Sequence, residues 1–251
     1  MTAAYPFVLW GFLVLALAVG PVLLLVSAPY GRHARRGWGP SVPAPLGWLL
    51  MEAPSPLLLG ALVLAGGGPR DAATWALVAL WEAHYLHRAF VWPLRLRGQR
   101  RPMPVLVMAM GMSFNAVNAW LNGAWLGSLG PGYPAAWLHD PRFLAGVALF
   151  VGGFAVNQHS DRILLRLRPR GATGYVVPRE GLFRWVSCPN YLGEITEWVG
   201  YALAAWSLPA LAFALWTAAN LVPRALSHHR WYQRTFPDYP PERRAVLPGL
   251  L

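Results

Sequence analysis

Polar side chains recur at helical spacing within two otherwise apolar stretches of this 251-residue sequence. Asn157 and Asp161 are four residues apart, and Asn190, Glu194 and Glu197 follow one another at spacings of four and three. Residues three or four apart lie on one face of a helix, so each stretch is predicted to carry a polar stripe. Because carboxylates are costly to expose to lipid, both stripes are expected to face the interior of a helical bundle.

A third pair, His228 and Tyr232, has the same spacing, and an arginine-rich loop around Arg168 separates the first two stripes. Arginines, amides, tyrosines and carboxylates around one cavity suit a ligand that carries both phosphates and ribose or ring hydroxyls. These residue types therefore favour a phosphorylated cofactor. The alternative is that the arginines only set topology and the polar stripes only join helices.

Glu52 and Tyr85 are the candidates for chemistry on an apolar substrate. Each lies about seven or eight residues from the end of its apolar stretch, and a rise of about 1.5 Å per helical residue places the two at similar depth. A carboxyl group inside a bilayer costs roughly 2.5 kcal/mol or more unless it is paired or faces an internal cavity. We therefore predict a functional role for Glu52, with a structural hydrogen bond between helices as the alternative.

The elements that position these residues are predicted to be membrane helices. The chain is 56% hydrophobic and 12% charged, whereas soluble domains are about 45–50% apolar and about 25% charged. Only a helix satisfies its own backbone within an apolar stretch of about 20 residues in lipid, and the alternating pattern of a membrane barrel is missing. We expect an all-α integral membrane bundle that forms one domain, residues 1–251. Seven transmembrane helices are predicted at residues 5–27, 44–65, 72–92, 104–127, 143–161, 191–206 and 208–223.

The 21 basic residues, all of them arginine, predict the orientation of these helices. Only Arg70 and Arg142 fall in one set of alternate loops. The positive-inside rule therefore places the N-terminus outside and the C-terminus in the cytoplasm. The expected location is the plasma membrane of a bacterium or the endoplasmic reticulum membrane of a eukaryote. Since topology accounts for the arginines, nucleic-acid binding is not predicted; membrane lipids and a lipid-like substrate are the expected partners of a monomer.

Several common sites are not predicted. The sequence has no P-loop and no glycine-rich dinucleotide motif after a strand. Its seven histidines are too few for a membrane di-iron centre, so no metal is expected. The single cysteine, Cys188, excludes an internal disulfide framework. No basic residue precedes the first apolar stretch, and Pro29 follows the small residue Ala28, which opposes cleavage as a signal peptide.

Eight segments resemble the steroid 5α-reductase family, in the same order and over nearly the whole chain. They are Tyr30–His33, Trp48–Ser55, His84–Phe90, Asn157–Asp161, Asn190–Trp198, Gly200–Leu203, Trp206–Ala214 and His228–Tyr232. Individual segments are shared more widely, because the motif beginning at Asn190 also resembles sterol reductases. The ordered set is specific to the steroid 5α-reductases.

This resemblance implies a seven-helix membrane reductase that takes NADPH from the cytosolic side and delivers a hydride to C5 of a 3-oxo-Δ4 steroid such as testosterone or progesterone. By position in the family, Glu52 and Tyr85 would hold the 3-keto oxygen, with Trp48 and Met51 beside the steroid. Met51 replaces a glutamine of the relatives, which leaves the polar contacts to the ketone and the preferred steroid open. The family's cofactor-binding positions correspond to Arg97, Asn157, Asp161, Arg168, Tyr175, Asn190, Glu194, His228 and Tyr232.

The implied reaction assigns roles to the two candidate catalytic residues. Hydride addition at C5 would move electron density to the carbonyl oxygen, and the resulting enolate needs nearby donors. Glu52 is therefore expected to be protonated or to share a proton with Tyr85. Three alternatives stay open: an isoprenylcysteine-type methyltransferase using S-adenosylmethionine, supported by Pro189–Gly193; a reductase of a non-steroid lipid enone or polyprenol; and a sterol-binding protein without activity.

Overall fold

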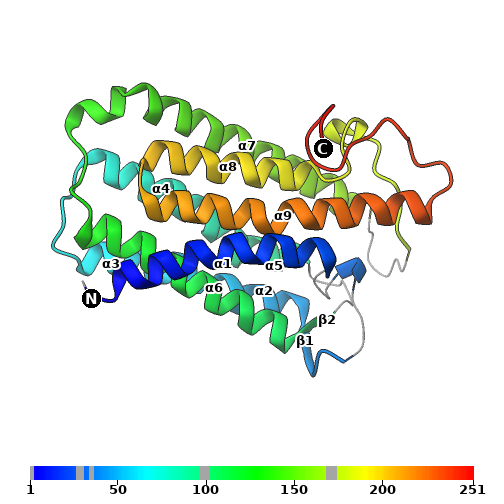
Figure 1. Ribbon diagram of the computed structural model, residues 1–251, viewed down its shortest axis with the longest axis horizontal. Helices are drawn as coiled ribbons and strands as arrows, with labels where there is room; N and C mark the ends of the chain where they lie inside the picture. The colour runs from blue at the N-terminus through cyan, green and yellow to red at the C-terminus, as the bar shows by residue number, and fades with distance from the viewer. Residues whose placement is uncertain (1–2, 27–30, 34–36, 97–101, 168–173) are drawn as a thin grey trace.

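The computed structural model describes residues 3–26, 31–33, 37–96, 102–167 and 174–251, and most of these residues are helical. The long helices run side by side along the long axis of the molecule, and the N-terminus and the C-terminal segment lie towards opposite ends (Figure 1). The helices are α1 (Tyr5–Leu25), α2 (Ala44–Glu52), α3 (Pro54–Ala65), α4 (Ala72–Leu86), α5 (Trp92–Arg95), α6 (Val105–Ala124), α7 (Pro141–Arg166), α8 (Pro189–Ala205) and α9 (Leu208–Thr235).

Short segments connect these helices. The helical turns are η1 (Gly31–His33), the π-helical η2 (His87–Val91) and η3 (Trp125–Leu129), η4 (Ala135–His139) and η5 (Gly181–Arg184). The strands β1 (Ser41–Pro43) and β2 (Pro102–Pro104) form an antiparallel pair in which Val42 is opposite Met103. This pair was not expected from the sequence, and it brings the starts of α2 and α6 together.

Three helical stretches of the described chain are long and apolar enough to cross a membrane: Tyr5–Leu25, Ala44–Ala65 and Pro141–Arg166. The predicted class, a mostly helical membrane protein, is confirmed at this level. Each of the other predicted spans also contains a helix, but α6 carries three buried asparagines and α8 carries two glutamates, which lower their apolar character. The seven-span topology and the orientation of the termini stay predictions.

Two helix boundaries differ from the predicted spans. The stretch predicted at residues 44–65 is divided at Ala53, because Pro54 has no N–H to donate to the preceding turn. The last helix does not end at residue 223: α9 continues through Pro223 to Thr235. His228 and Tyr232 therefore lie on the same helix as the predicted final span.

The closest helix pair is α7 and α8, and glycines make that approach possible. A Cβ atom placed on Gly193 would lie 2.5 Å from the backbone nitrogen of Asn157 and 2.6 Å from the carbonyl oxygen of Gly153. Gly146 and Gly200 meet backbone atoms of the facing helix in the same way. Small residues of this kind let helix backbones touch. The contact holds the polar stripes of α7 and α8 against each other.

A cluster of buried aromatic rings supports the middle of the bundle. Trp81 and Tyr85 of α4 have ring centroids 4.9 Å apart, and Trp198 of α8 lies 5.6 Å from Tyr85. Phe213 of α9 lies 4.2 Å from Trp198. Because each of these four rings is at most 4% exposed, tight packing restricts the orientation of Tyr85.

Candidate active site

Two neighbouring cavities lie between the helices. The first is lined by polar and aromatic side chains that include Arg32, Asp161, Tyr175, Asn190, Tyr191, Arg224, His228 and Tyr232. The second has mainly apolar walls, with Val107, Phe114, Trp198, Phe213 and Trp216, and also contains Met51, Glu52, His84, Tyr85 and Asn115. Trp48, Arg88, Met103, Glu194 and Leu221 line both. The two cavities therefore share a wall.

Glu52 and Tyr85 both line the second cavity, and Asn115 of α6 connects them. The amide Nδ2 of Asn115 donates to Oε2 of Glu52 at 3.0 Å, and the hydroxyl of Tyr85 donates to Oδ1 of Asn115 at 3.4 Å. Sequence reasoning placed Glu52 and Tyr85 together but missed Asn115. The sequence does contain a pattern that could have identified it. Asn115, Asn118 and Asn122 are spaced three and four residues apart in an apolar stretch, as the residues of the other polar stripes are.

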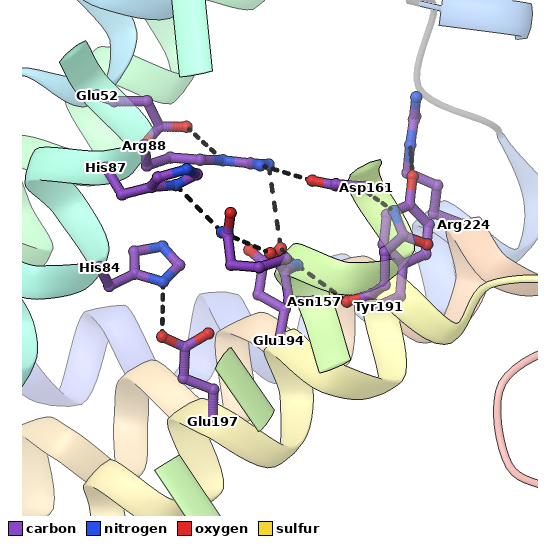
Figure 2. Close-up of polar contacts among 12 residues, drawn as sticks. Glu52, His84, His87, Arg88, Asn157, Asp161, Tyr191, Glu194, Glu197 and Arg224 are labelled. Atoms are coloured by element: carbon purple, nitrogen blue, oxygen red, sulfur yellow. Dashed lines mark hydrogen bonds and ion pairs between the residues drawn. The ribbon is translucent and has the colours of Figure 1, made fainter. Parts of the chain in front are cut away.

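Arg88 lies at the wall between the cavities and faces three carboxyl groups. Its guanidinium nitrogens are 3.8 Å from Glu52, 3.6 Å from Asp161 and 4.0 Å from Glu194 (Figure 2). The guanidinium also lies over the ring of Trp48, 4.6 Å from its centroid. Sequence analysis counted Arg88 only among the arginines that set topology. In the structure it belongs to the π-helical turn η2, and it connects Glu52 to the polar stripes of α7 and α8.

The stripes of α7 and α8 meet beside Arg88. Nδ2 of Asn157 donates to the carbonyl oxygen of Asn190 at 3.0 Å and to Oε2 of Glu194 at 3.3 Å. Nδ2 of Asn190 donates to Oδ1 of Asp161 at 3.2 Å. Figure 2 shows Asn157 and Asp161 of α7 converging with Glu194 of α8. Four of the predicted cofactor-binding residues are thus in one connected group.

Tyr175 and Tyr232, also predicted cofactor-binding residues, lie at the far side of the first cavity around Arg32. The guanidinium of Arg32 is 5.1 Å from the ring centroid of Tyr175, 4.7 Å from that of Trp231 and 4.4 Å from that of Tyr232. Arg32 also donates to the hydroxyl of Tyr232 at 3.2 Å. The result is a cationic group enclosed by aromatic faces.

His228 lies between this aromatic group and α8. Its Nδ1 is 2.9 Å from Nε2 of His33, and its Nε2 is 3.2 Å from the hydroxyl of Tyr191. Arg224, one turn earlier on α9, donates from Nε to the same hydroxyl at 3.0 Å. Because α9 is continuous here, all three contacts come from one helix face.

Of the remaining predicted site residues, two line the cavities and two are not described by the structure. Trp48 lines both cavities and Met51 lines the second, with its carbonyl oxygen accepting from Asn115 at 2.8 Å. Arg97 and Arg168 lie outside the described residues.

His84 and Glu197 form a buried pair that the sequence did not predict. Nδ1 of His84 is 2.8 Å from Oε1 of Glu197, and Glu197 has no exposed surface. Figure 2 shows the pair one helical turn from the Glu194 group. Glu197 was predicted only as part of the α8 stripe. Its partner His84 lines the second cavity.

Ser187 connects the C-terminal segment to the start of α8 at the edge of the first cavity. Its hydroxyl is 2.6 Å from Nδ1 of His229 and 2.6 Å from the hydroxyl of Tyr239. Burial, with Arg244 and Arg230 nearby, lowers the pKa of His229, and burial raises the pKa of Tyr239. Both side chains are therefore neutral at neutral pH and can hold Ser187 by ordinary hydrogen bonds.

The first cavity fits a nucleotide cofactor with phosphates. Nη1 of Arg32 is buried and has no hydrogen-bond partner within the part of the chain that the structure describes, so it is a donor suited to a phosphate oxygen. The ring of Tyr175, which lines the cavity, suits a planar base, and the amides and carboxyls of α7 and α8 suit ribose hydroxyls and an amide. The second cavity, with mainly apolar walls and a few polar groups, suits a lipid-like substrate.

The fold and the site together define a helical membrane protein in which a polar, arginine-containing cavity adjoins an apolar cavity that contains a carboxyl and a phenol. The family model of 3-oxo-5-alpha-steroid 4-dehydrogenase matches residues 101–251. The chain is 41% identical to 3-oxo-5-alpha-steroid 4-dehydrogenase 1 of Bos taurus, with 100% of each chain covered. It is 44% identical to 3-oxo-5-alpha-steroid 4-dehydrogenase 2 of Sus scrofa, with 92% of each covered, and 41% identical to a steroid 5-alpha-reductase of Gossypium hirsutum, with 94% and 93% covered.

The chain belongs to the 3-oxo-5-alpha-steroid 4-dehydrogenase family, the steroid 5α-reductases. It is accordingly an oxidoreductase that acts on a CH–CH group. The resemblance inferred from the ordered segments is confirmed.

Proposed function

We propose that this protein catalyses the NADPH-dependent reduction of the Δ4 double bond of 3-oxo-Δ4 steroids such as testosterone or progesterone. The observation that carries the proposal is the wall shared by the two cavities, where Trp48, Arg88 and Glu194 face both sides. A cofactor bound in the first cavity and a substrate bound in the second would meet at this wall.

The residues of the first cavity are assigned to the cofactor. Arg32 would bind a phosphate of the cofactor, with Tyr175 and Tyr232 enclosing the guanidinium. His228, one turn before Tyr232 on α9, would also contact the cofactor. Asp161, Asn190 and Glu194 line this cavity and would fix the end of the cofactor nearest Arg88. Asn157 is not among the lining residues and would act by holding Asn190 and Glu194 in place. When bound there, NADPH supplies the hydride that a carbonyl-conjugated double bond accepts at its β-carbon.

The residues of the second cavity are assigned to the steroid. Its apolar wall, including Phe114, Trp198 and Phe213, would bury the rings and exclude water. Glu52 and Tyr85 would donate to the 3-keto oxygen. When a C5–H bond forms, the electron pair of the Δ4 bond moves toward this oxygen, and these donors stabilise the resulting enolate. A proton taken up at C4 then completes the saturated ketone.

Arg88 is assigned a positioning role between the two ligands. Its contacts with Glu52, Asp161 and Glu194 fix the carboxyl group on the substrate side relative to those on the cofactor side. A planar guanidinium can hold several carboxyls while its face lies on Trp48, which an ammonium cannot do. The geometry of hydride transfer depends on such fixed relative positions.

The alternatives differ in how much of the chain supports them. The methyltransferase interpretation rests on Pro189–Gly193 alone, whereas the match to steroid 5α-reductases covers at least 92% of the chain in the three relatives named above. A non-steroid lipid enone or a polyprenol would use the same two cavities. A sterol-binding protein without activity would have no use for the polar groups of the first cavity.

The test is a substrate panel with the purified, detergent-solubilised protein. NADPH oxidation is followed by absorbance with testosterone, progesterone, a non-steroid enone and a polyprenol. The product is then identified by mass and by its configuration at C5. We expect 5α-reduced steroids. If no steroid is reduced while another lipid is, the proposed substrate class is wrong; methyl transfer from labelled S-adenosylmethionine without NADPH oxidation contradicts the reductase proposal itself.

A further inference from the structure

Asn115 has a complete set of hydrogen bonds at the centre of the second cavity's polar groups. Nδ2 donates to the carbonyl oxygen of Met51 at 2.8 Å and to Oε2 of Glu52 at 3.0 Å. Oδ1 accepts from the hydroxyls of Ser55 at 3.0 Å and Tyr85 at 3.4 Å. A primary amide has two N–H donors and two acceptor lone pairs, so every one is used. Asn115 is only 4% exposed, and water cannot readily replace these contacts.

The orientation of this amide follows from its partners. The backbone carbonyl of Met51 can only accept, so the group facing it at 2.8 Å must be Nδ2. Oδ1 then faces the hydroxyls of Ser55 and Tyr85, and each of them must act as the donor. A flipped amide would place two oxygens against each other at Met51.

This orientation determines where hydrogens can lie on the two candidate catalytic groups. Oε2 of Glu52 accepts from Asn115, so a proton carried by Glu52 lies on Oε1. Without substrate, the single hydroxyl hydrogen of Tyr85 is donated to Oδ1 of Asn115 over a long 3.4 Å contact. We propose that Asn115 is a positioning residue for the reduction: it fixes the carboxyl rotamer of Glu52 and holds the hydroxyl of Tyr85 beside it, until the ketone oxygen replaces Oδ1 of Asn115 as the acceptor of the Tyr85 hydrogen. This inference rests on the proposed function.

A matched control lies on the same helix. Asn122 is two turns further along α6 and similarly buried, and among the residues that the structure describes its side chain donates only to Asn118, at 3.1 Å. It does not line the second cavity. Replacing Asn122 with Ala therefore removes the same side chain from the same helix without touching Glu52 or Tyr85.

The test compares Asn115→Ala, Asn115→Asp and Asn122→Ala with the parental protein. Asn115→Asp keeps the size and shape of the side chain but replaces both N–H donors with an oxygen that faces the Met51 carbonyl and Glu52. Loss of hydrogen bonds to a charged or reacting group lowers a rate roughly 10- to 100-fold, and we expect kcat for the enone to fall by that amount in both Asn115 variants. We expect the affinity for NADPH, measured by fluorescence, to be unchanged in all three variants, and kcat of Asn122→Ala to stay within about threefold of the parental value.

The outcomes separate this inference from the proposed function. If the parental protein reduces the enone and Asn115→Asp matches it, the side chain acts only by filling space and the inference is overturned while the function stands. If kcat falls as much in Asn122→Ala as in Asn115→Ala, the loss comes from disturbing helix α6 and not from the contacts of Asn115, and the inference is again overturned. A parental protein that does not reduce any enone refutes both. Should Asn115→Ala not fold, the isosteric Asn115→Asp with intact NADPH binding decides the question.

Discussion

Nε of Arg88 lies 3.8 Å from Oε1 of Glu52, at the wall where a polar cavity meets an apolar one. The same guanidinium faces Asp161 and Glu194 on the other side. Arg88 thus contacts carboxyl groups assigned to the substrate and to the cofactor, and its removal should disturb both sets of carboxyl groups.

Arg88→Leu leaves three carboxyl groups without their cation. Breaking a buried ion pair by removing one partner costs about 3–5 kcal/mol, and we expect the free energy of unfolding to fall by about that amount, with loss of activity. Arg88→Lys should recover stability but not activity, because an ammonium is not planar. Arg166→Leu is the control: its pair with Glu180 is 67% exposed on both sides, so the free energy of unfolding should change by less than about 1 kcal/mol. Thermal unfolding in detergent measures stability, and equal losses for Arg88→Leu and Arg166→Leu would contradict the assigned role of Arg88.

Glu52→Gln and Tyr85→Phe test the donors to the 3-keto oxygen. Each change keeps the shape of the side chain and removes either the ionisable proton or the hydroxyl. Tyr85→Phe removes one donor to a developing oxyanion and should lower kcat by roughly 100- to 1000-fold. Glu52→Gln keeps an N–H donor but removes the acidic proton, and kcat should fall there too. NADPH affinity should be unchanged in both variants because neither residue lines the first cavity. Single-turnover kinetics with bound NADPH measures the chemical step. Parental rates in either variant would remove that residue from the mechanism.

Adjacent glycines of α7 provide a test of the α7–α8 contact. A Cβ on Gly153 would lie 2.5 Å from the carbonyl oxygen of Gly193, whereas one on Gly152 has nothing within 4 Å. Gly153→Ala should destabilise the protein by about 1–3 kcal/mol through overpacking. Gly152→Ala should be neutral or stabilise it by up to about 1 kcal/mol. If the two variants unfold at the same temperature, the close approach of the helices does not hold the site together.

The single native cysteine makes the orientation of the chain testable. Cys188 is buried, and Cys188→Ala gives a cysteine-free background. Gly67 and Gly174 are both exposed, and a Cβ added to either would meet no atom of the described residues within 4 Å. They lie in loops predicted on opposite sides of the membrane. In intact bacterial cells, a membrane-impermeant maleimide should label Gly67→Cys and not Gly174→Cys, while both should react after lysis. The reverse labelling would invert the predicted topology.

Some parts of the fold and site follow directly from the sequence. Helical spacing alone grouped Asn157 with Asp161 and Asn190 with Glu194, and the hydrogen bond from Asn190 to Asp161 joins these pairs. That prediction works because carboxylates and amides in apolar helices are costly to expose to lipid, so they face the interior of the bundle or an internal cavity. Composition likewise predicted a mostly helical membrane protein.

Other parts depend on packing that periodicity does not encode. Arg88 lies at a helix end, where an arginine usually sets topology, and the π-helical turn η2 is what places it among three carboxyls. The last span was predicted to end at residue 223, yet α9 continues through Pro223 and carries His228 into the first cavity. No role was predicted for Asn115. Its four partners come from residues 51, 52, 55 and 85, and only the folded chain brings them together.

Transfer of an isotopic label tests most directly whether the cofactor and the enone meet at the wall formed by Arg88 and Trp48. Testosterone is incubated with the purified protein and NADPH that carries deuterium at both positions of C4 of the nicotinamide, and the product is analysed by mass spectrometry and NMR. We predict one deuterium per product molecule, bound to C5 on the α face, with the hydrogen at C4 coming from solvent. Deuterium at C3, as in reduction of the ketone, or a product without deuterium would contradict direct hydride transfer between the two cavities.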